Sequence, residues 1–252
     1  MNATAPPVPP AVTWHDAECG GYSSDLPFWE RLATRRGGPV LDLGAGTGRV
    51  ALHLAARGHE VVAVDSDAGL LAVLRERARE RGFQVEAVHA DVRTLDLPGR
   101  RFPLAIAPMQ LLHMLGGSES RRLALAATAA HLEPAGLFAA AVLAEPLPPS
   151  GPTEGLPDVR EVGGWVHSSL PLEVRVDGGA IEIVRLRQLV APDGTMTEEV
   201  DVTTVDRLPA GVIEGEARTA GLNLVGSESI PETDEHVGSI ALLLQRDEEG
   251  SA

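Results

Sequence analysis

VLDLGAGTGR, residues 40–49, passes from an apolar run into three glycines at alternate positions. Glycine has no Cβ, so Gly44, Gly46 and Gly48 allow the backbone to turn sharply and to approach a ligand closely. A dinucleotide fingerprint of the form G-x-G-x-x-G requires glycine or alanine at its sixth position, where this sequence has Arg49. The loop therefore indicates a nucleoside cofactor and argues against a nicotinamide dehydrogenase.

The segments after the loop continue an alternation of helix and strand. Residues 49–57 (RVALHLAAR) are typical of a helix, and residues 60–64 (EVVAV) predict a strand that leads to Asp65. An acid at the end of the second strand can accept hydrogen bonds from both hydroxyls of a ribose. Asp91 follows the next predicted strand, residues 85–90, and places a carboxylate where the exocyclic amine of an adenine would arrive.

These residues resemble the class I S-adenosylmethionine-dependent methyltransferases of the small-molecule type, whose first motif reads (V/L)-L-D-(L/V)-G-x-G-x-G. The resemblance covers roughly residues 20–145 and the last strand, and continues through Asp65, Asp91-Val92, residues 103–115 and the turn at residues 132–136. The family's turn ends in two glycines, where this chain has Ala135-Gly136. The resemblance implies an α/β fold with a Rossmann-like seven-stranded sheet, helices on both faces, a last strand inserted antiparallel, and a small antiparallel β insertion after the fifth strand.

The same resemblance implies the cofactor, S-adenosyl-L-methionine, with S-adenosyl-L-homocysteine as its product. In this family the first acid and the glycines hold the methionine part, the second acid binds the ribose and the third region binds adenine. Carried over by position, the expected cofactor contacts are Tyr22, Asp42, Gly44, Ala45, Gly46, Asp65, Ser66, Asp91, Val92, Pro108 and His113. No metal is expected, because residues 105–109 (AIAPM) end the fourth strand without a carboxylate.

His113 is the candidate catalytic residue. It lies just past the fourth strand in the run QLLHML, residues 110–115, at a position that adjoins the methyl group in the family. A neutral imidazole there could accept a proton from an amine or a hydroxyl near pH 7. The alternative is a histidine that packs against the cofactor or bonds a backbone carbonyl.

The pattern of apolar and charged residues differs between parts of the chain. In residues 159–206 apolar and charged side chains alternate as in strands, and turn signals at residues 177–179 and 192–194 separate antiparallel strands. We expect this insertion to be a substrate lid or a homodimer interface. The predicted parts are a flexible, proline-rich N-terminal tail (1–20), a cofactor-binding α/β core (21–150), the antiparallel β insertion (151–206) and the end of the core (207–252).

Residues for the methyl acceptor are expected around the insertion. Glu145 follows the fifth strand and either anchors a substrate amine or caps a turn. Trp165 and His167 are two residues apart, so they share one face of a strand and are assigned to substrate binding. Arg185 and Arg187 also share a face, which binds a carboxylate or phosphate or is a solvated surface.

Composition narrows the functional classes further. All 21 basic residues are arginine, which excludes lysine Schiff-base chemistry, and the formal net charge of -15 without a basic stripe argues against nucleic acid as partner. No apolar stretch of about 18 residues is present to span a membrane. The single Cys19 cannot form an internal disulfide, which fits a cytoplasmic protein.

The sequence thus predicts a methyltransferase that methylates a nitrogen or oxygen of a small molecule by metal-independent, in-line transfer. The arginine-only, alanine-rich composition suggests a high-GC bacterium and a place in secondary metabolism. The alternative is a protein of the same fold that binds the cofactor but catalyses a non-methylating reaction or serves as a binding partner, since a fold does not fix a function.

Overall fold

The computed structural model describes residues 5–145, 149–233 and 237–248. Residues 1–4 of the expected tail, and residues 146–148 where the expected core meets the insertion, lie outside the described residues. The chain divides into two compact units. We call Ser23–Pro146 with Leu208–Ala252 the α/β unit, and Met1–Tyr22 with Leu147–Arg207 the β unit.

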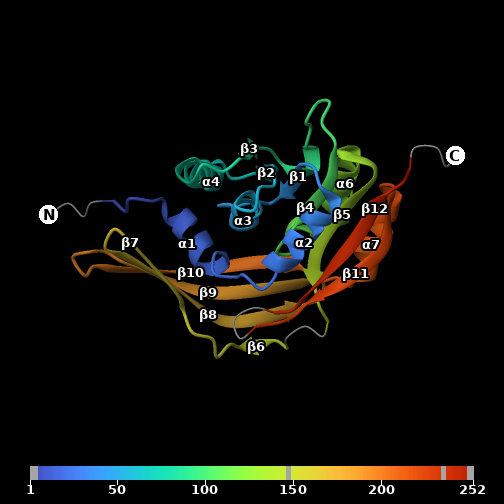
Figure 1. The fold of residues 1–252 in the computed structure, drawn as a ribbon. Coiled ribbons are helices and arrows are strands. Elements are labelled where there is room, and N and C mark those ends of the chain that lie inside the picture. Colours follow the sequence, from blue (N-terminus) through green and yellow to red (C-terminus); the bar gives the residue numbers. More distant parts are fainter. Residues whose placement is uncertain (1–4, 146–148, 234–236, 249–252) are drawn as a thin grey trace. The chain divides into compact units, whose positions relative to one another are not determined.

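The α/β unit is built on a seven-stranded sheet with the order β11-β12-β5-β4-β1-β2-β3 (Figure 1). Strands β1 to β5 pair in parallel, and β12 is antiparallel to both β5 and β11. The predicted sheet with its antiparallel last strand is confirmed. The strands are β1 Val40–Leu43, β2 Val61–Asp65, β3 Val85–His89, β4 Phe102–Ala107, β5 Leu132–Leu143, β11 Leu222–Ile230 and β12 Ser239–Arg246.

Helices cover both faces of this sheet, as Figure 1 shows, because its parallel strands are apolar on both sides. Helices α2, α3 and α4 pack in series on strands of one face, while α6 packs on α7 and on the 3₁₀-helix η1 on the other. Their bounds are α2 Leu26–Arg36, α3 Arg49–Ala55, α4 Ala68–Arg81, η1 Val92–Thr94, α5 Leu111–Met114, α6 Ser118–Ala130 and α7 Ala210–Thr219.

The start of β5 contains a strained alanine. The pairing of β4 with β5 shifts between Phe102 and Leu104, because residues 133–136 bulge from the ladder. Ala135 takes a φ of 58°, a left-handed conformation that alanine rarely adopts. Its carbonyl accepts hydrogen bonds from Gln245 Nε2 (3.1 Å) and Arg36 Nη1 (3.4 Å). Glycine, which the family has at the position of Ala135, would therefore relieve the strain there.

The β unit contains a second, wholly antiparallel sheet with the order β10-β9-β8-β6, and β7 also pairs with β8. Gly178 (φ 53°) and Gly194 (φ 86°) lie in the turns that join β8 to β9 and β9 to β10. The predicted antiparallel strands are confirmed at these hairpins. The strands are β6 Gly151–Pro152, β7 Asp158–Val162, β8 Trp165–Asp177, β9 Ala180–Val190 and β10 Met196–Asp206.

The expected flexible tail is wrong for the segment Pro10–Cys19, which forms helix α1 and packs on β7 and β8. Proline is tolerated in the first turn of a helix because its missing N–H would have no partner there, so the proline-rich start does not prevent the helix. Val12 and Trp14 are buried in the packing. The proline-rich segment therefore leads into the helix, which begins at Pro10, and the expected tail does not extend to residue 20.

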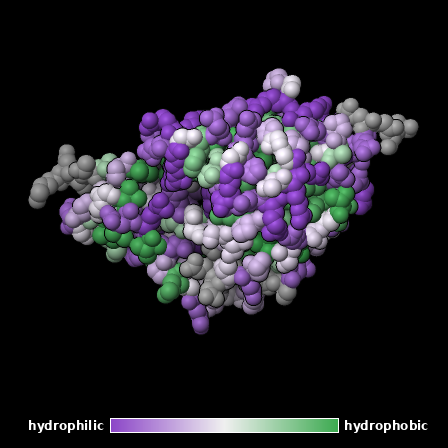
Figure 2. Space-filling view, in the orientation of Figure 1, coloured by the Kyte–Doolittle hydropathy of each residue, from purple (hydrophilic) through white to green (hydrophobic). Residues whose placement is uncertain are grey.

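Hydrophilic residues prevail on the face drawn in Figure 2, with separate hydrophobic patches between them. This pattern fits a chain in which 23% of the residues are charged.

Candidate cofactor site

The glycine loop connects β1 to α3 at the carboxyl end of the parallel strands. Gly44, Gly46 and Gly48 all have positive φ, at 70°, 55° and 92°. A Cβ on Gly48 would lie 2.1 Å from Leu74 Cδ1 of α4, so a side chain there has no room. Glycine is thus required at this position by both conformation and packing.

Asp65 is fastened to the glycine loop by hydrogen bonds. Its Oδ2 accepts from the Gly46 amide at 2.8 Å, and its Oδ1 accepts from the Asp67 amide at 2.8 Å. The loop is also hydrogen-bonded to β2, because the Val64 carbonyl accepts from Gly44 N and Ala45 N. A carboxylate has about four lone-pair positions, so the oriented Asp65 can still accept from the diol of a ribose.

Asp42 is a buried carboxyl group under the loop. It is 1% exposed, and among the described residues neither of its oxygens has a side-chain hydrogen-bond partner, while the Ala51 backbone acts on it as a donor. Burial raises the pKa of Asp42 to about 7, with the nearby Asp65 and Asp25 carboxylates adding to the rise and Arg49 opposing it. Such a group is stabilised by a ligand that brings a positive charge or hydrogen-bond donors.

Arg49, the positively charged side chain that acts on Asp42, forms an ion pair with Asp25. Its Nη1 and Nη2 lie 2.5 and 2.8 Å from the two oxygens of Asp25, which also accepts from Trp29 Nε1 at 2.8 Å. Asp25 is 2% exposed. Sequence reasoning missed Asp25, which lies directly before α2, although aspartate is a favoured residue at the start of a helix.

Asp91 lies just beyond β3 and has a partner of its own. The Arg93 side chain donates through Nε to both carboxylate oxygens at 2.9 Å, and the Arg93 amide donates to Oδ1 at 2.8 Å. These hydrogen bonds from Arg93 hold the pKa of Asp91 below its usual value. Val92 beside it is buried, so the pair offers an ionised carboxylate next to an apolar wall, as predicted for an adenine. Arg93 was not predicted.

The segment after β4 is strained and anchored. Pro108 is buried, and Met109 and Gln110 follow it with left-handed φ angles of 54° and 58°. Each such residue costs roughly 1 to 3 kcal/mol and persists only where its surroundings hold it. Gln110 Nε2 donates to the hydroxyl of Ser239 on β12 at 2.7 Å, and Ser239 is 4% exposed. Strain of this kind is typical of functional sites.

His113 lies in α5, which follows this strained segment, and is 1% exposed. Its Nε2 accepts a hydrogen bond from the Leu143 amide at the end of β5, at 3.2 Å. The lone pair that a general base would use is therefore engaged by the backbone. This contact favours the packing alternative for His113.

The remaining expected contacts are distributed between the two units. In the α/β unit, Ser66 is exposed and its carbonyl lies 3.0 Å from His89 Nε2, while Glu145 is exposed beyond β5. Tyr22 is buried and belongs to the β unit. The structure brings together, at the carboxyl ends of neighbouring strands β1 to β4, the set Asp42, Gly44, Ala45, Gly46, Asp65, Ser66, Asp91, Val92, Pro108 and His113.

Trp165 and His167 lie on one face of β8, as the spacing predicted. They are 9% and 1% exposed, and the ring of His167 meets Trp14 of α1 edge-on, with centroids 4.8 Å apart. Burial lowers the pKa of His167, and a hydrogen bond with the backbone of Trp165 opposes that change. Because Trp14 of α1 lies against the ring of His167, contact of His167 with a substrate would require α1 to move.

Within residues 5–145, 149–233 and 237–248, no group of three or more His, Cys, Asp or Glu side chains is arranged to hold a metal ion. No helix in this part of the chain is long and apolar enough to cross a membrane.

Known proteins are similar to this chain in sequence and in fold. A family model described as a methyltransferase domain matches residues 40–136. An uncharacterized methyltransferase of Mycobacterium bovis is 34% identical over 107 residues, which are 42% of this chain and 51% of that protein. The matched segments cover between 22% and 51% of the length of the curated relatives.

Solved structures share the fold over most of the chain. The CcbJ methyltransferase from Streptomyces caelestis has a TM-score of 0.70 at 24% identity, covering 90% of this chain and 92% of that one. The sugar N-methyltransferase KedS8 from Streptoalloteichus has a TM-score of 0.74 at 17% identity, covering 98% of this chain and 96% of that one. At these identities the likeness establishes the fold.

Proposed function

We propose that the protein transfers a methyl group from S-adenosylmethionine to a nitrogen or oxygen of a small molecule, because a family model described as a methyltransferase domain matches residues 40–136. The observation that carries the proposal is the buried carboxyl group of Asp42, which has no side-chain partner among the described residues, beside a glycine loop whose Gly46 amide orients Asp65. Asp42 suits the ammonium group of the cofactor's methionine part, and Asp65 suits the hydroxyl groups of its ribose.

The residues present match the cofactor piece by piece. Asp42 would face the methionine ammonium, which supplies positive charge and donors to a carboxyl group that has no side-chain partner among the described residues. Asp65 would accept from the ribose hydroxyls while keeping its bonds to Gly46 N and Asp67 N. Asp91 would accept from the adenine amine, with Val92 as the apolar wall of the base pocket.

Bound S-adenosylmethionine would supply an electrophilic methyl carbon on a positively charged sulfur. The chain's tasks are then to hold the acceptor in line and, where the acceptor carries a proton, to remove it. We assign the strained segment Met109–Gln110 to positioning, because its conformation is fixed by Ser239. His113 can act as a base only by giving up its bond from Leu143 N, so we assign it first to holding α5 on β5.

The acceptor is proposed to be a small metabolite with a nucleophilic nitrogen. Support comes from the name of the neighbour KedS8, a sugar N-methyltransferase whose fold this chain shares over 98% of its length. The arginine-only, alanine-rich composition of the sequence, which suggests a high-GC bacterium, agrees with an enzyme of bacterial secondary metabolism.

Titration calorimetry with S-adenosylmethionine, S-adenosylhomocysteine and, as a negative control, NAD tests the cofactor assignment. We expect both sulfur nucleosides to bind, and Asp65→Asn to weaken them about 10- to 100-fold through the loss of charged hydrogen bonds. Glu76→Gln, which removes an exposed ion pair with Arg79 on α4, should leave binding unchanged. Absence of binding in the wild-type protein would overturn the proposal.

A panel of small amines and alcohols, with S-adenosylhomocysteine detected by mass spectrometry, then tests the reaction. Methylated product with stoichiometric S-adenosylhomocysteine supports methyl transfer. Tight cofactor binding with conversion of an acceptor but without S-adenosylhomocysteine would indicate a non-methylating reaction instead.

A further inference from the structure

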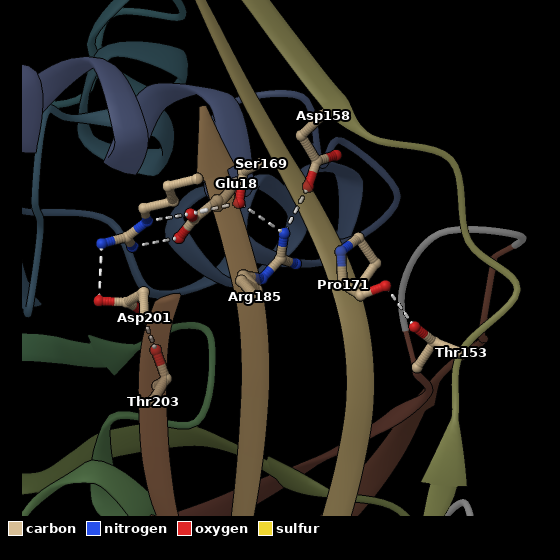
Figure 3. A network of polar contacts seen from close by, with 9 residues as sticks. Glu18, Thr153, Asp158, Ser169, Pro171, Arg185, Asp201 and Thr203 are labelled. Carbon is tan, nitrogen blue, oxygen red and sulfur yellow. Dashed lines mark hydrogen bonds and ion pairs between the residues drawn. The ribbon is translucent and has the colours of Figure 1, made fainter. Parts of the chain in front are cut away.

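The carboxylate of Glu18, on α1, is held in the β unit as a bound ligand would be. Its Oε1 accepts from Arg187 Nε at 2.8 Å and from the Ser169 hydroxyl at 2.7 Å, and its Oε2 accepts from Arg187 Nη2 at 2.9 Å. Figure 3 shows Glu18 and Ser169 facing each other across this contact. A bidentate arginine with an added hydroxyl donor is a strong and specific arrangement for a carboxylate.

The strands hold these donors in place without help from Glu18. Arg187 also contacts Asp201 of β10 at 2.7 Å. Arg185, the neighbouring arginine on the same face of β9, donates to Asp158 at 2.8 Å and to the Ser169 hydroxyl at 3.2 Å (Figure 3). The side chains of both arginines are less than one-fifth exposed, so the solvated-surface alternative for them is wrong.

Each of the two arginines has an acidic partner on a strand in addition to any contact with α1. Arg185 and Arg187 are matched by Asp158 and Asp201, all four on strands. Glu18 is thus an additional anion, and a carboxylate from outside would replace it charge for charge. Burial alone raises the pKa of Glu18, but hydrogen bonds from Arg187 and Ser169 lower it below its usual value, so the position favours an ionised carboxylate.

Helix α1 is weakly secured for a segment that buries a charge. It has ten residues, no side-chain cap at its N-terminus and no acid in its first turn. A helix of that length is marginal in water by itself. The buried Thr13 hydroxyl has no hydrogen-bond partner among the described residues, and a buried polar group in that state opposes the docked arrangement.

We propose that the sheet face around Arg187, Ser169 and Arg185 is a binding site for a carboxylate of the methyl acceptor, and that Glu18 occupies it as an internal substitute until the acceptor displaces it. Displacement exposes His167, which lies two residues from Ser169 on β8, about 6.6 Å along the strand. The ligand class is therefore a small carboxylate with a second hydrogen-bonding group at about that separation. That this ligand is the methyl acceptor rests on the proposed function.

Binding of acetate, with uncharged acetamide as the control and at constant ionic strength, tests the site without any cofactor. We expect Glu18→Ala to bind acetate at least about tenfold more tightly than the wild type, because Glu18 leaves the site free for only a minor fraction of the time. Acetate should also accelerate hydrogen exchange of residues 10–19 in the wild type, and acetamide should not. Glu18→Ala with Arg187→Gln should bind no acetate.

Asp16→Asn is the matched control, since it weakens another contact of α1, with Arg160 of β7 at 3.5 Å, but leaves Glu18 in place. Its acetate affinity should stay well below that of Glu18→Ala, because Glu18 still occupies the site. Equal acetate binding by Glu18→Ala and wild type, binding that survives Arg187→Gln, or unchanged exchange of α1 would each overturn the proposal and leave Glu18 a structural clamp. Glu18→Gln, which preserves the side-chain volume, replaces Glu18→Ala if that variant does not fold. Since these measurements involve no methyl transfer, their failure is distinct from failure of the proposed function.

Discussion

Arg49 Nη1 lies 2.5 Å from Asp25 Oδ1, and both side chains are at most 10% exposed. This pair fixes the start of α2 beside the start of α3 and commits the arginine's charge to Asp25. The third ionisable group of the cluster, Asp42, therefore has no hydrogen-bonded counter-ion among the described residues. Burial raises the pKa of Asp42 even though the charge of Arg49 opposes the rise, and the carboxylates of Asp65 and Asp25 add to it.

The Asp42 proton should make stability depend on pH. The folded protein keeps this proton up to about pH 7, whereas the unfolded chain releases it at the ordinary aspartate pKa, so the folded state is favoured at low pH. As the pH rises between those two values, the free energy of unfolding should fall by about 1.4 kcal/mol per pH unit from this group.

Urea unfolding of the wild type and of Asp42→Asn over this pH range measures the effect. The difference between them should show the slope, and the exposed Asp96→Asn should behave as the wild type. Parallel profiles for wild type and Asp42→Asn would show that Asp42 is ionised throughout.

Ala135→Gly should stabilise the protein. At φ 58° alanine carries a steric penalty that glycine avoids, so the free energy of unfolding should rise by up to about 1 kcal/mol after the extra entropy of glycine is allowed for. Chemical denaturation provides the measurement. Ala139→Gly, in the buried part of the same strand, is the contrasting control and should lower stability by at least about 0.5 kcal/mol. A loss of stability in both variants would contradict the strain assigned to Ala135.

Ser239→Ala should impair turnover more than cofactor binding. Without the hydroxyl, Gln110 loses the bond that holds the left-handed segment, and a hydrogen bond of about 0.5 to 1.5 kcal/mol corresponds to a roughly two- to tenfold lower kcat. The Kd for S-adenosylmethionine should stay at the wild-type value. The exposed Ser229→Ala on β11 serves as control. An equal loss in Kd and kcat would assign Ser239 to the cofactor site instead.

The sequence by itself predicted the edge of the sheet at which we propose that the cofactor binds. Asp42, Asp65 and Asp91 could be placed because each follows or ends an apolar strand, and neighbouring parallel strands bring their carboxyl ends to one edge. The hairpins at Gly178 and Gly194 were predictable for a similar reason, since turn residues act locally. These features depend on spacings of a few residues, which a single sequence displays directly.

Only the tertiary structure decided which charges pair. Asp25 and Arg49 are 24 positions apart, and Glu18 and Arg187 are 169 apart, so no periodicity relates them. The helix at Pro10–Cys19 depends on the same long-range packing, because its Trp14 is buried against a strand that begins at Trp165. Local propensity could not reveal these contacts, since their energy arises only when packing removes distant side chains from water.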